Sequence, residues 1–479
     1  MFSDALPFAS NYVCELSDEL HRRYAGRSLG KTQQGWLSFC LTGLLLTGSL
    51  CWAAFERTGL GSYRVGALSW MFRSSKLPWS GLLQASVSLL LRWHKLPQGV
   101  LVADDSDHRR AKSTTCIYGA HKVFDKKTSG YFNGQCLIFL ILVTDKATFP
   151  VGVRFYRPDP AQRAWRQENA RLIKAGIQAA DRPKAPALNP DYPGKAEMAL
   201  SLIEEFCTNH PDFIVKAVLA DAFFGTRTFM DAACAKAKCT QTISQLHADQ
   251  LVVFRGRKMS VQAYVEKHSG TLQRVCVRGG ETLDMWVSSA RLMVQAHGRK
   301  RFVIAVRNKD EAEYRYLVAS DMAWRTQDIV QCYTLRWLVE VFFEDWKLHE
   351  GWANLAKQPG KDGAVRGVTL SLLLDHALLI HPEQRARLEK REPACTVGRL
   401  KRAAHAEAFL QLVQKILQAT DSGQRLEQLV EKLKQLFPLA PSKKHMSDRD
   451  LGRQEPTPSL RYRAAAANAS TMAEGSASA

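Results

Sequence analysis

Residues 333–347 read Y-T-L-R-W-L-V-E-V-F-F-E-D-W-K, and this stretch is the most informative in the chain. On a helix turning about 100° per residue, one face collects four polar side chains: Tyr333, Arg336, Glu340 and Lys347. The other face is an apolar stripe that predicts packing against a core; it comprises Leu335, Val339, Phe342 and Trp346. A carboxylate binds divalent metals, whereas guanidinium, ammonium and phenol groups hold phosphate oxygens. The polar face therefore suits metal-assisted chemistry on a phosphodiester.

The charge of the chain favours a polyanionic partner. Its 479 residues include 66 Lys and Arg against 46 Asp and Glu, a formal net charge of +20. Proteins this basic often bind nucleic acid, because neutralised phosphates release their counterions. A generic basic surface is the alternative. The length leaves room for roughly two to four domains and a large core.

The cysteines indicate reduced thiols rather than a disulfide framework or a zinc site. Eleven are scattered along the chain, and Cys234 and Cys239 are the only close pair. No Cys or His pair follows them at the spacing of a zinc site. The N-terminus lacks a basic segment followed by an apolar one, so we expect no secretory signal. Together these features predict a cytosolic protein.

One uncharged segment admits two interpretations. Thr32 to Phe55 carries no charge and is long enough to cross a bilayer. Its apolar run is diluted by threonine, glycine and serine, as in a buried helix of a globular protein. We favour the buried helix and expect no membrane association.

Strand patterns begin near residue 98. VLVADDSD, GYFNGQCLIFLILVTD and TFPVGVRFY predict three strands, and alternating helix and strand patterns follow to residue 246. This order predicts an α/β domain with a mixed sheet. The expected regions are a helical N-terminal region (1–96), the core's first part (97–244), a β-rich insertion (245–321), the catalytic helix (322–350), a C-terminal helical region that serves as a candidate for dimerisation (351–441) and a disordered tail (442–479).

Three carboxylates stand where a metal site could form. Asp105 and Asp221 follow buried strands, and Glu340 lies on the helix described above. Acids at the ends of neighbouring strands, with a third from a packed helix, can hold two hard cations about 4 Å apart. The pattern does not choose among Asp104, Asp105 and Asp107 at the first strand. Glu344 competes with Glu340 on the helix.

At this point the chain resembles the insertion-sequence-4 family of bacterial DDE transposases. The family pattern Y-x2-R-x3-E-x6-K is matched by Tyr333, Arg336, Glu340 and Lys347. The family's first acid lies in a D-D-T-like element, similar to residues 104–106. Its second lies in a D-x-x-Y/F-G-like element, similar to residues 221–225. The resemblance covers about residues 97 to 350.

The resemblance implies a ribonuclease-H-like catalytic core with a β-rich insertion, flanked by helical terminal regions. It implies Asp105, Asp221 and Glu340 as catalytic metal ligands for two Mg²⁺ ions, with Mn²⁺ as a substitute. The implied partners are the inverted-repeat ends of a DNA element and a double-stranded target, and the implied location is the bacterial cytoplasm, in association with the nucleoid. In several relatives a DNA hairpin is the intermediate, and the motif's Tyr, Arg and Lys grip phosphates near the cut.

Two positions depart from the family pattern. Tyr316 occupies a slot where the best-studied members carry a Trp that receives a flipped base, and Trp286 is the reserve candidate for that role. A phenol can still stack on a base, and a half-buried strand aromatic is the alternative. Glu344 stands where some relatives have a phosphate-holding Lys, which predicts a weaker local grip on DNA.

These observations favour a cut-and-paste transposase that acts as a homodimer on paired DNA ends. A metal-dependent nuclease or host-adapted relative without strand transfer is the nearest alternative. A basic DNA-binding protein with a decayed site is another. The helical N-terminal region could bind DNA or serve as an ordinary helical cap.

Overall fold

The computed structural model describes residues 4–24, 26–110, 117–125, 128–277, 281–352, 360–389 and 395–417. The predicted tail at 442–479 and the end of the C-terminal helical region lie outside these ranges. The helices are α1 (Pro7–Arg23), α2 (Lys31–Thr47), α3 (Trp52–Thr58), α4 (Val65–Ser74), α5 (Trp79–Trp93), α6 (Pro160–Lys174), α7 (Lys195–Asn209), α8 (Arg227–Ala237), α9 (Val261–Lys267), α10 (Thr326–Thr334), α11 (Trp337–Leu348), α12 (Gly360–Leu379), α13 (Pro382–Glu389) and α14 (Val397–Leu417).

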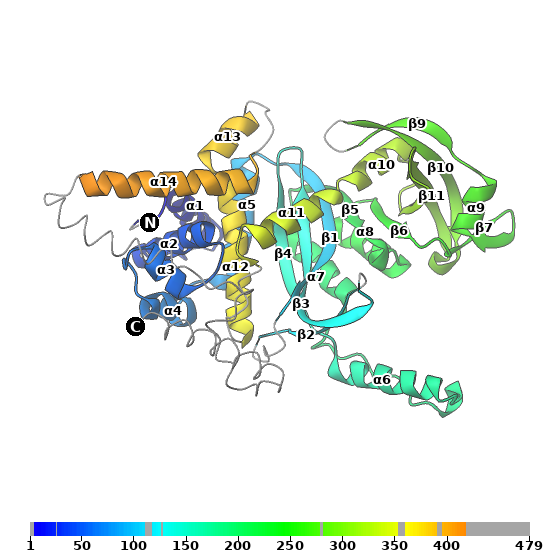
Figure 1. The fold of residues 1–479 in the computed structure, drawn as a ribbon. Coiled ribbons are helices and arrows are strands. Elements are labelled where there is room, and N and C mark those ends of the chain that lie inside the picture. The colour runs from blue at the N-terminus through cyan, green and yellow to red at the C-terminus, as the bar shows by residue number, and fades with distance from the viewer. Residues whose placement is uncertain are drawn as a thin grey trace, which may run out of the picture. The chain divides into compact units, whose positions relative to one another are not determined.

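The strands of the described residues form one mixed sheet (Figure 1). They are β1 (Gln98–Arg109), β2 (His121–Asp125), β3 (Gly130–Val143), β4 (Thr148–Tyr156), β5 (Ile214–Ala220), β6 (Thr242–Leu246), β7 (Leu251–Phe254), β8 (Arg257–Ser260), β9 (Thr271–Cys276), β10 (Thr282–Val294), β11 (Arg299–Asn308) and β12 (Arg315–Ala319). Their order is β2-β3-β1-β5-β6-β12-β11-β10-β7-β8, with β4 paired to β3 and β9 to β10.

The core of the sheet has ribonuclease-H-like topology, as predicted. Strand β1 is central and pairs antiparallel with β3, which pairs antiparallel with β4. On its other side β1 pairs parallel with β5, and β5 pairs parallel with β6. The three antiparallel strands come first in the chain and the two parallel ones after α7. A mixed α/β sheet with helical flanks is therefore the architecture.

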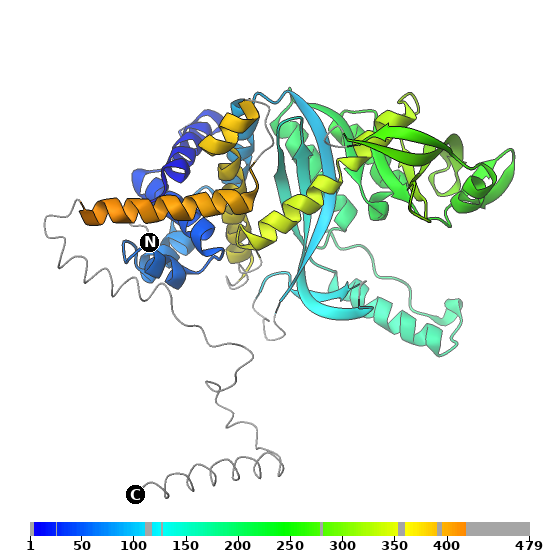
Figure 2. The same cartoon turned by 45° about the horizontal axis from the view of Figure 1, so that its top comes forward.

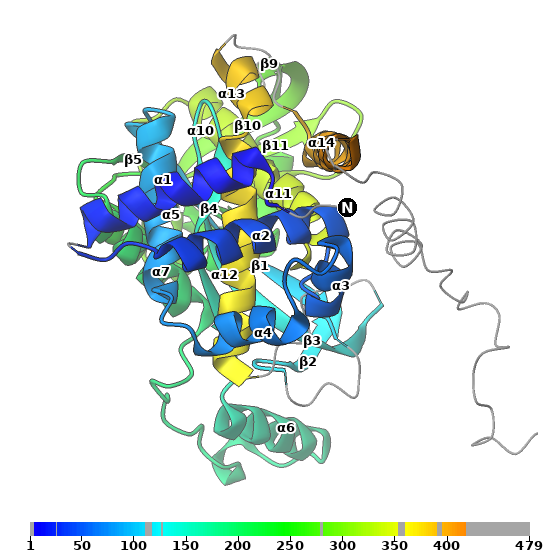
Figure 3. The ribbon, with the colours of Figure 1, turned by 90° about the vertical axis from the view of Figure 1, so that its left-hand side faces the viewer.

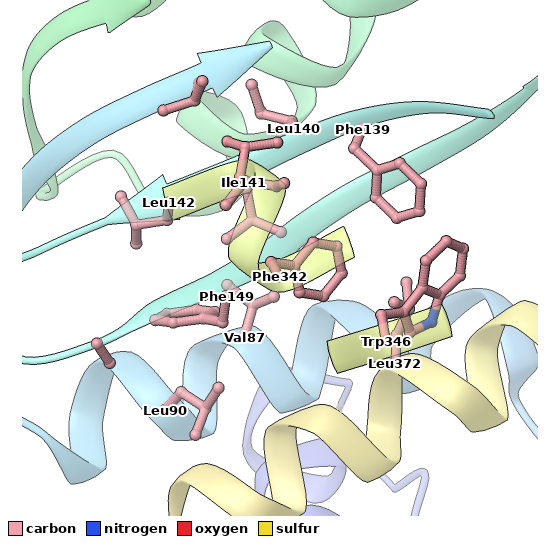
Figure 4. Close-up of a cluster of buried hydrophobic side chains, with 14 of the residues drawn as sticks. Val87, Leu90, Phe139, Leu140, Ile141, Leu142, Phe149, Phe342, Trp346 and Leu372 are labelled. Carbon is pink, nitrogen blue, oxygen red and sulfur yellow. The ribbon is translucent and has the colours of Figure 1, made fainter. Parts of the chain in front are cut away.

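Strand β3 explains why this core is stable. Its residues 134–143 are all buried, a continuous run typical of a strand covered on both faces. Helix α7 packs against one face. On the other, Phe139 contacts the rings of Phe342 and Trp346 from α11 (Figure 4). It also contacts the ring of Phe343. The apolar stripe predicted for the catalytic helix is thus buried against the sheet.

The predicted β-rich insertion forms strands β7 to β12. Strand β12 pairs with β6 of the core, so the insertion continues the same sheet instead of forming a separate one. The short helix α9 interrupts it, although the sequence pattern predicted only strands there. A second apolar cluster fills the insertion and includes Val252, Leu292 and Tyr316.

Residues 333–347, which were predicted to lie on one catalytic helix, belong to two helices. Tyr333 lies in the last turn of α10, which ends at Thr334, and α11 begins at Trp337 with Arg336 as its N-cap. Between them the amides of Arg336 and Val339 bond carbonyls three residues back, Tyr333 and Arg336 respectively. Such bonds tighten the turn, so the single-helix prediction was wrong. The break lets α10 pack near β6 and β9 while α11 runs across β1 and β4 (Figure 2).

The terminal helices are joined to the core by a buried chain of hydrogen bonds. Helices α5 and α12 contact each other and β4 (Figure 3). The Tyr12 hydroxyl bonds Ser86 at 2.6 Å, and Ser86 bonds Nδ1 of His376 at 2.6 Å. Nε2 of His376 lies 2.9 Å from the carbonyl oxygen of Pro150 on β4. Burial lowers the pKa of His376 to about 4, so the neutral ring bridges these elements.

The uncharged N-terminal segment forms buried α2 and the short α3. Within the described ranges, no single helix is both long and apolar enough to cross a bilayer. Together α2 and α3 would reach the required length, but they meet at 91°. Every cysteine that the structure describes is a free thiol, as the scattered pattern predicted.

Candidate active site

Strand β1 carries the first acids of the site on two different faces. The sequence predicted that the strand ends at these acids, but it continues to Arg109 because residues 104–109 pair with 134–139 of β3. Successive side chains of a strand alternate between faces. Asp104 pairs with Phe139 and shares the face covered by α11, whereas Asp105 and Asp107 share the opposite face.

Asp104 is neutralised by the motif arginine. It is 6 % exposed, and Nη1 of Arg336 donates to its Oδ2. Burial raises the pKa of Asp104 to about 7, although the Arg336 charge acts in the opposite direction. The predicted phosphate-gripping arginine is therefore held by an acid of the sheet.

Asp105 is paired with a lysine that sequence reasoning missed. Nζ of Lys195, the first residue of α7, lies 2.6 Å from Oδ2 of Asp105. The thiol of Cys136 donates to the same oxygen at 3.5 Å, and burial raises the pKa of Cys136 so that it stays protonated. Ligand atoms of Asp105, Asp107 and Cys136 lie within 4.8 Å of one another.

Asp221 follows β5 directly, at the level of Asp104 in the neighbouring strand. Ala220 pairs with Ala103 in the parallel ladder, so Asp221 comes level with the acids of β1. Its Oδ1 accepts from the Phe223 amide at 3.0 Å, which fixes the carboxylate at a helical turn. Burial and then the charge of Asp105 raise the pKa of Asp221. Asp105 and Asp221 therefore act electrostatically on each other.

Glu340 approaches from the first turn of α11. Its side chain is 55 % exposed, and Oε1 lies 3.8 Å from Nη2 of Arg336. A carboxylate in a first turn is stabilised by the helix dipole. One groove of about 2190 Å³ is lined by Asp104, Asp105, Asp107, Asp221 and Glu340 together. The three predicted acids thus line one groove, although their ligand atoms do not all lie within 4.8 Å of one another.

The donor set fits a hard divalent cation. Asp105, Asp221 and Glu340 offer carboxylate oxygens, the ligands that Mg²⁺ prefers. Oδ1 of Asp107 is buried and has no hydrogen-bond partner among the described residues. A buried oxygen of this kind is stabilised when a cation or a bound water reaches it.

The side chains of Tyr333 and Lys347 donate hydrogen bonds to backbone carbonyls next to the acids. The Tyr333 hydroxyl donates to the Ala220 carbonyl at 3.4 Å, next to Asp221. Nζ of Lys347 donates to the Asp107 carbonyl at 3.2 Å, and burial lowers its pKa. Neither side chain lines the groove, whereas Arg336 does. Of the predicted phosphate contacts, only Arg336 is therefore at the groove surface.

The aromatic residues considered for base flipping lie elsewhere. Tyr316 is 8 % exposed and belongs to the apolar cluster of the insertion, so its ring offers no free face for a base. The structure thus does not bring Tyr316 to the acids: β12 lies between β6 and β11 in the sheet, and Tyr316 does not line the groove. Trp286 is half-buried on β10, with the Arg307 guanidinium 5.8 Å from its ring centre.

Lys195 had no signal in the sequence pattern that could have identified it. It opens an ordinary amphipathic helix, and its pairing with Asp105 depends on how α7 crosses the sheet. Asp104 was one of the open choices, but its partner Arg336 could be found only from the fold.

One family of known proteins matches a large part of the chain. Residues 25–303, more than half of the chain, match the family described as DDE superfamily endonuclease. The match includes Asp105 and Asp221 and ends before Glu340. No curated protein matches this chain in sequence.

Two solved structures show weak likeness. A piggyBac transposase synaptic complex with hairpin DNA has a TM-score of 0.37 and 11% identity, with 94% of this chain and 86% of that chain covered. The NurA nuclease from Sulfolobus solfataricus has a TM-score of 0.17 and 8% identity, with 50% of this chain and 72% of that chain covered. Both scores are too low to support an argument about function.

Proposed function

We propose a DNA-cutting function for this chain, which belongs to the family of DDE superfamily endonucleases. The proposed enzyme cleaves phosphodiester bonds at the ends of a DNA element and joins the freed 3′-hydroxyls to a target duplex. The observation that supports it best is that Asp105, Asp221 and Glu340, from three separate elements, line one groove. The narrower assignment to the insertion-sequence-4 group rests on the motif of residues 333–347.

Asp105, Asp221 and Glu340 would hold the divalent cations, two Mg²⁺ ions with Mn²⁺ as a substitute. When bound, the ions activate a water or 3′-hydroxyl and stabilise the leaving oxygen of an in-line displacement. The Tyr333 and Lys347 side chains hold the backbone beside Asp221 and Asp107. These two hydrogen bonds fix the backbone of β5 and of β1, next to the acids, relative to α10 and α11.

We assign the first catalytic acid to Asp105 and not to its neighbour. Both acids are ion-paired, Asp104 with Arg336 and Asp105 with Lys195, so the ion pairs do not distinguish them. Their exposure does: the Asp104 side chain is 8 % exposed, whereas the Asp105 side chain is 21 % exposed at the groove. In this assignment Asp104 is a positioning residue that orients Arg336 toward the phosphate of the bound DNA.

The paired substitutions Asp105→Asn and Asp104→Asn test this assignment. Both replace a carboxyl group with an amide of nearly the same volume. We expect Asp105→Asn to abolish metal-dependent cleavage of DNA, and Asp104→Asn to leave measurable cleavage with a raised KM for DNA. Full cleavage by Asp105→Asn would contradict the assignment.

Strand transfer separates the proposed transposase from a nuclease that only cuts. Both partners in the reaction, the element's ends and a target plasmid, are needed for this assay. We propose a homodimer as the acting form because concerted insertion requires two ends together. Joined products in the presence of Mg²⁺ support transposition, whereas cleavage without joining supports the nuclease alternative. A DNA hairpin at the flank would identify the hairpin route.

A further inference from the structure

The groove that holds the acids extends beyond them to a second, basic end. There it is bounded by α6 on one side and by the hairpin of β2 and β3 on the other. This end of the groove is lined by Lys122, Phe124 and Tyr131 of the hairpin and by Arg163, Arg166 and Gln167 of α6. In Figures 1 and 3, α6 lies beyond the β2 end of the sheet.

The cations at the acid end of the groove form ion pairs, whereas the three at the basic end form none within the described part of the chain. At the acid end, Lys195 and Arg336 are each paired with a carboxylate. At the basic end, Lys122, Arg163 and Arg166 form no ion pair with any residue in the described ranges. Three cations without a partner in one groove attract an anion, since each keeps its full charge available.

Helix α6 lies outside the hydrophobic core. It spans 15 residues and none of its side chains is buried. Its contacts are polar ones to the segment that returns to α7: Trp165 Nε1 donates to the Pro183 carbonyl, and Arg182 donates to Asn169. Isolated helices of this length are marginal in water. A projecting helix with a basic inner face is therefore suited to a partner outside the chain.

The hairpin adds an aromatic wall. Phe124 and Tyr131 are cross-strand neighbours with ring centres 5.3 Å apart. They are 49 % and 72 % exposed, which is unusual for two adjacent large rings. Exposed aromatic faces beside cations are the combination that binds nucleic acid, because rings stack on bases while cations hold the backbone.

We propose that this basic end binds the DNA segment adjoining the cut, with Arg163 and Arg166 on backbone phosphates and Tyr131 on a base at the duplex end. The inference rests on the proposed DNA-cutting function, since the groove joins this surface to the acids without interruption. Phosphate contacts carry no sequence information, so this surface positions the duplex and does not select it.

The test compares two double variants of the same helix. Arg163→Ala/Arg166→Ala removes the two groove cations. Arg171→Ala/Lys174→Ala removes two cations of α6 that do not line the groove, and Arg171 is already paired with Glu168. Each lowers the charge by two, so a general charge effect is equal in both. Binding of a 30-base-pair duplex of mixed sequence is measured with Ca²⁺ at several salt concentrations.

We expect the groove variant to lower the slope of log Kd against log salt by about 1.8, and the control to leave it nearly unchanged. At low salt the groove variant should bind several-fold more weakly. Tyr131→Ala should weaken binding of a duplex with a frayed end by about tenfold, with little effect on a closed duplex. Far-ultraviolet circular dichroism verifies that α6 stays folded in both double variants.

Equal slopes for the two double variants would overturn the proposal, as would failure of the wild-type chain to bind the duplex. Cleavage is measured separately with Mg²⁺. A chain that binds through α6 without cutting would leave this inference standing and contradict the proposed function. If the wild-type chain cuts normally and the groove variant binds DNA like the control, the proposed function stands and this inference is contradicted.

Discussion

Lys195 and Asp105 are 90 residues apart in the chain, yet Nζ of the lysine lies 2.6 Å from Oδ2 of the acid. Asp104, one residue earlier, is paired with Arg336 from α11. Both neighbouring acids of β1 are thus balanced by cations from different helices on opposite faces of the sheet. The site keeps its carboxylates close together because the chain supplies these two cations.

Removing the lysine should strengthen metal binding. Lys195→Ala takes a positive charge away from Asp105, and a like charge at this distance opposes a divalent cation. We expect Mn²⁺ to bind about tenfold more tightly, as measured by isothermal titration calorimetry. Lys216→Ala, an exposed lysine of β5 outside the groove, serves as the control. Weaker binding of Mn²⁺ to Lys195→Ala would show that the lysine supports the metal site.

Substitutions of two glutamates one turn apart on α11 should affect DNA cleavage differently. Glu340 lines the groove, whereas Glu344 is exposed and does not. Glu340→Gln should abolish cleavage and leave DNA binding nearly unchanged, since it removes a metal ligand but no phosphate donor. Glu344→Gln should cleave normally. If Glu344→Gln lost cleavage while Glu340→Gln kept it, the third acid would be Glu344.

Trp346 anchors α11, and its loss should destabilise the whole core. The ring is fully buried, stacks on Trp352 at 4.7 Å and meets Phe139 at 4.9 Å. Trp346→Ala should cost about 3–5 kcal/mol of unfolding free energy, as measured by chemical denaturation. Trp337→Ala on the same helix should cost much less, because Trp337 is 49 % exposed. Equal losses would mean that α11 is not fixed through Trp346.

A buried acid pair should make stability depend on pH. Asp375 of α12 neighbours Glu350, and burial raises the pKa of both, that of Asp375 to about 8. An unfolded aspartate titrates near 3.9, so unfolding between about pH 4 and pH 8 releases a proton. The stability from this group is therefore complete below pH 4 and is lost as the pH rises through 8.

The substitution Asp375→Asn measures that contribution, because the amide stays neutral at every pH. From pH 6 to pH 8 the unfolding free energy of the wild type should fall by about 2 kcal/mol relative to the variant. Urea denaturation at the two pH values gives the difference. A constant difference would mean that Asp375 is ionised in the folded chain throughout this range.

Much of the core could be predicted because its patterns are local. The continuous apolar run of β3 and the stripe of Val339, Phe342 and Trp346 both reflect burial that the sequence displays directly. The break between α10 and α11 could not be predicted, since every residue from Tyr333 to Lys347 is compatible with a helix. It arises because the two parts pack on different strands.

The partners of the acids were hidden for a different reason. An alternating strand puts Asp104 and Asp105 on opposite faces, but choosing the faces requires the register with β3. The pairing of Lys195 with Asp105 depends on the path of α7 across the sheet. Tyr316 was expected at the DNA from the family resemblance alone, and the burial of β12 within the sheet removes it from the groove.

The central claim is that Asp221 belongs to a metal-dependent site for DNA cleavage. The most direct test is cleavage of a supercoiled plasmid carrying the element's own ends, with Mg²⁺ or with EDTA, by the wild type and by Asp221→Asn. We predict double-strand cuts at the ends that require Mg²⁺ and are lost in the variant, while both chains bind the plasmid. Binding of the plasmid by the wild type without cutting under Mg²⁺ or Mn²⁺ would contradict the claim.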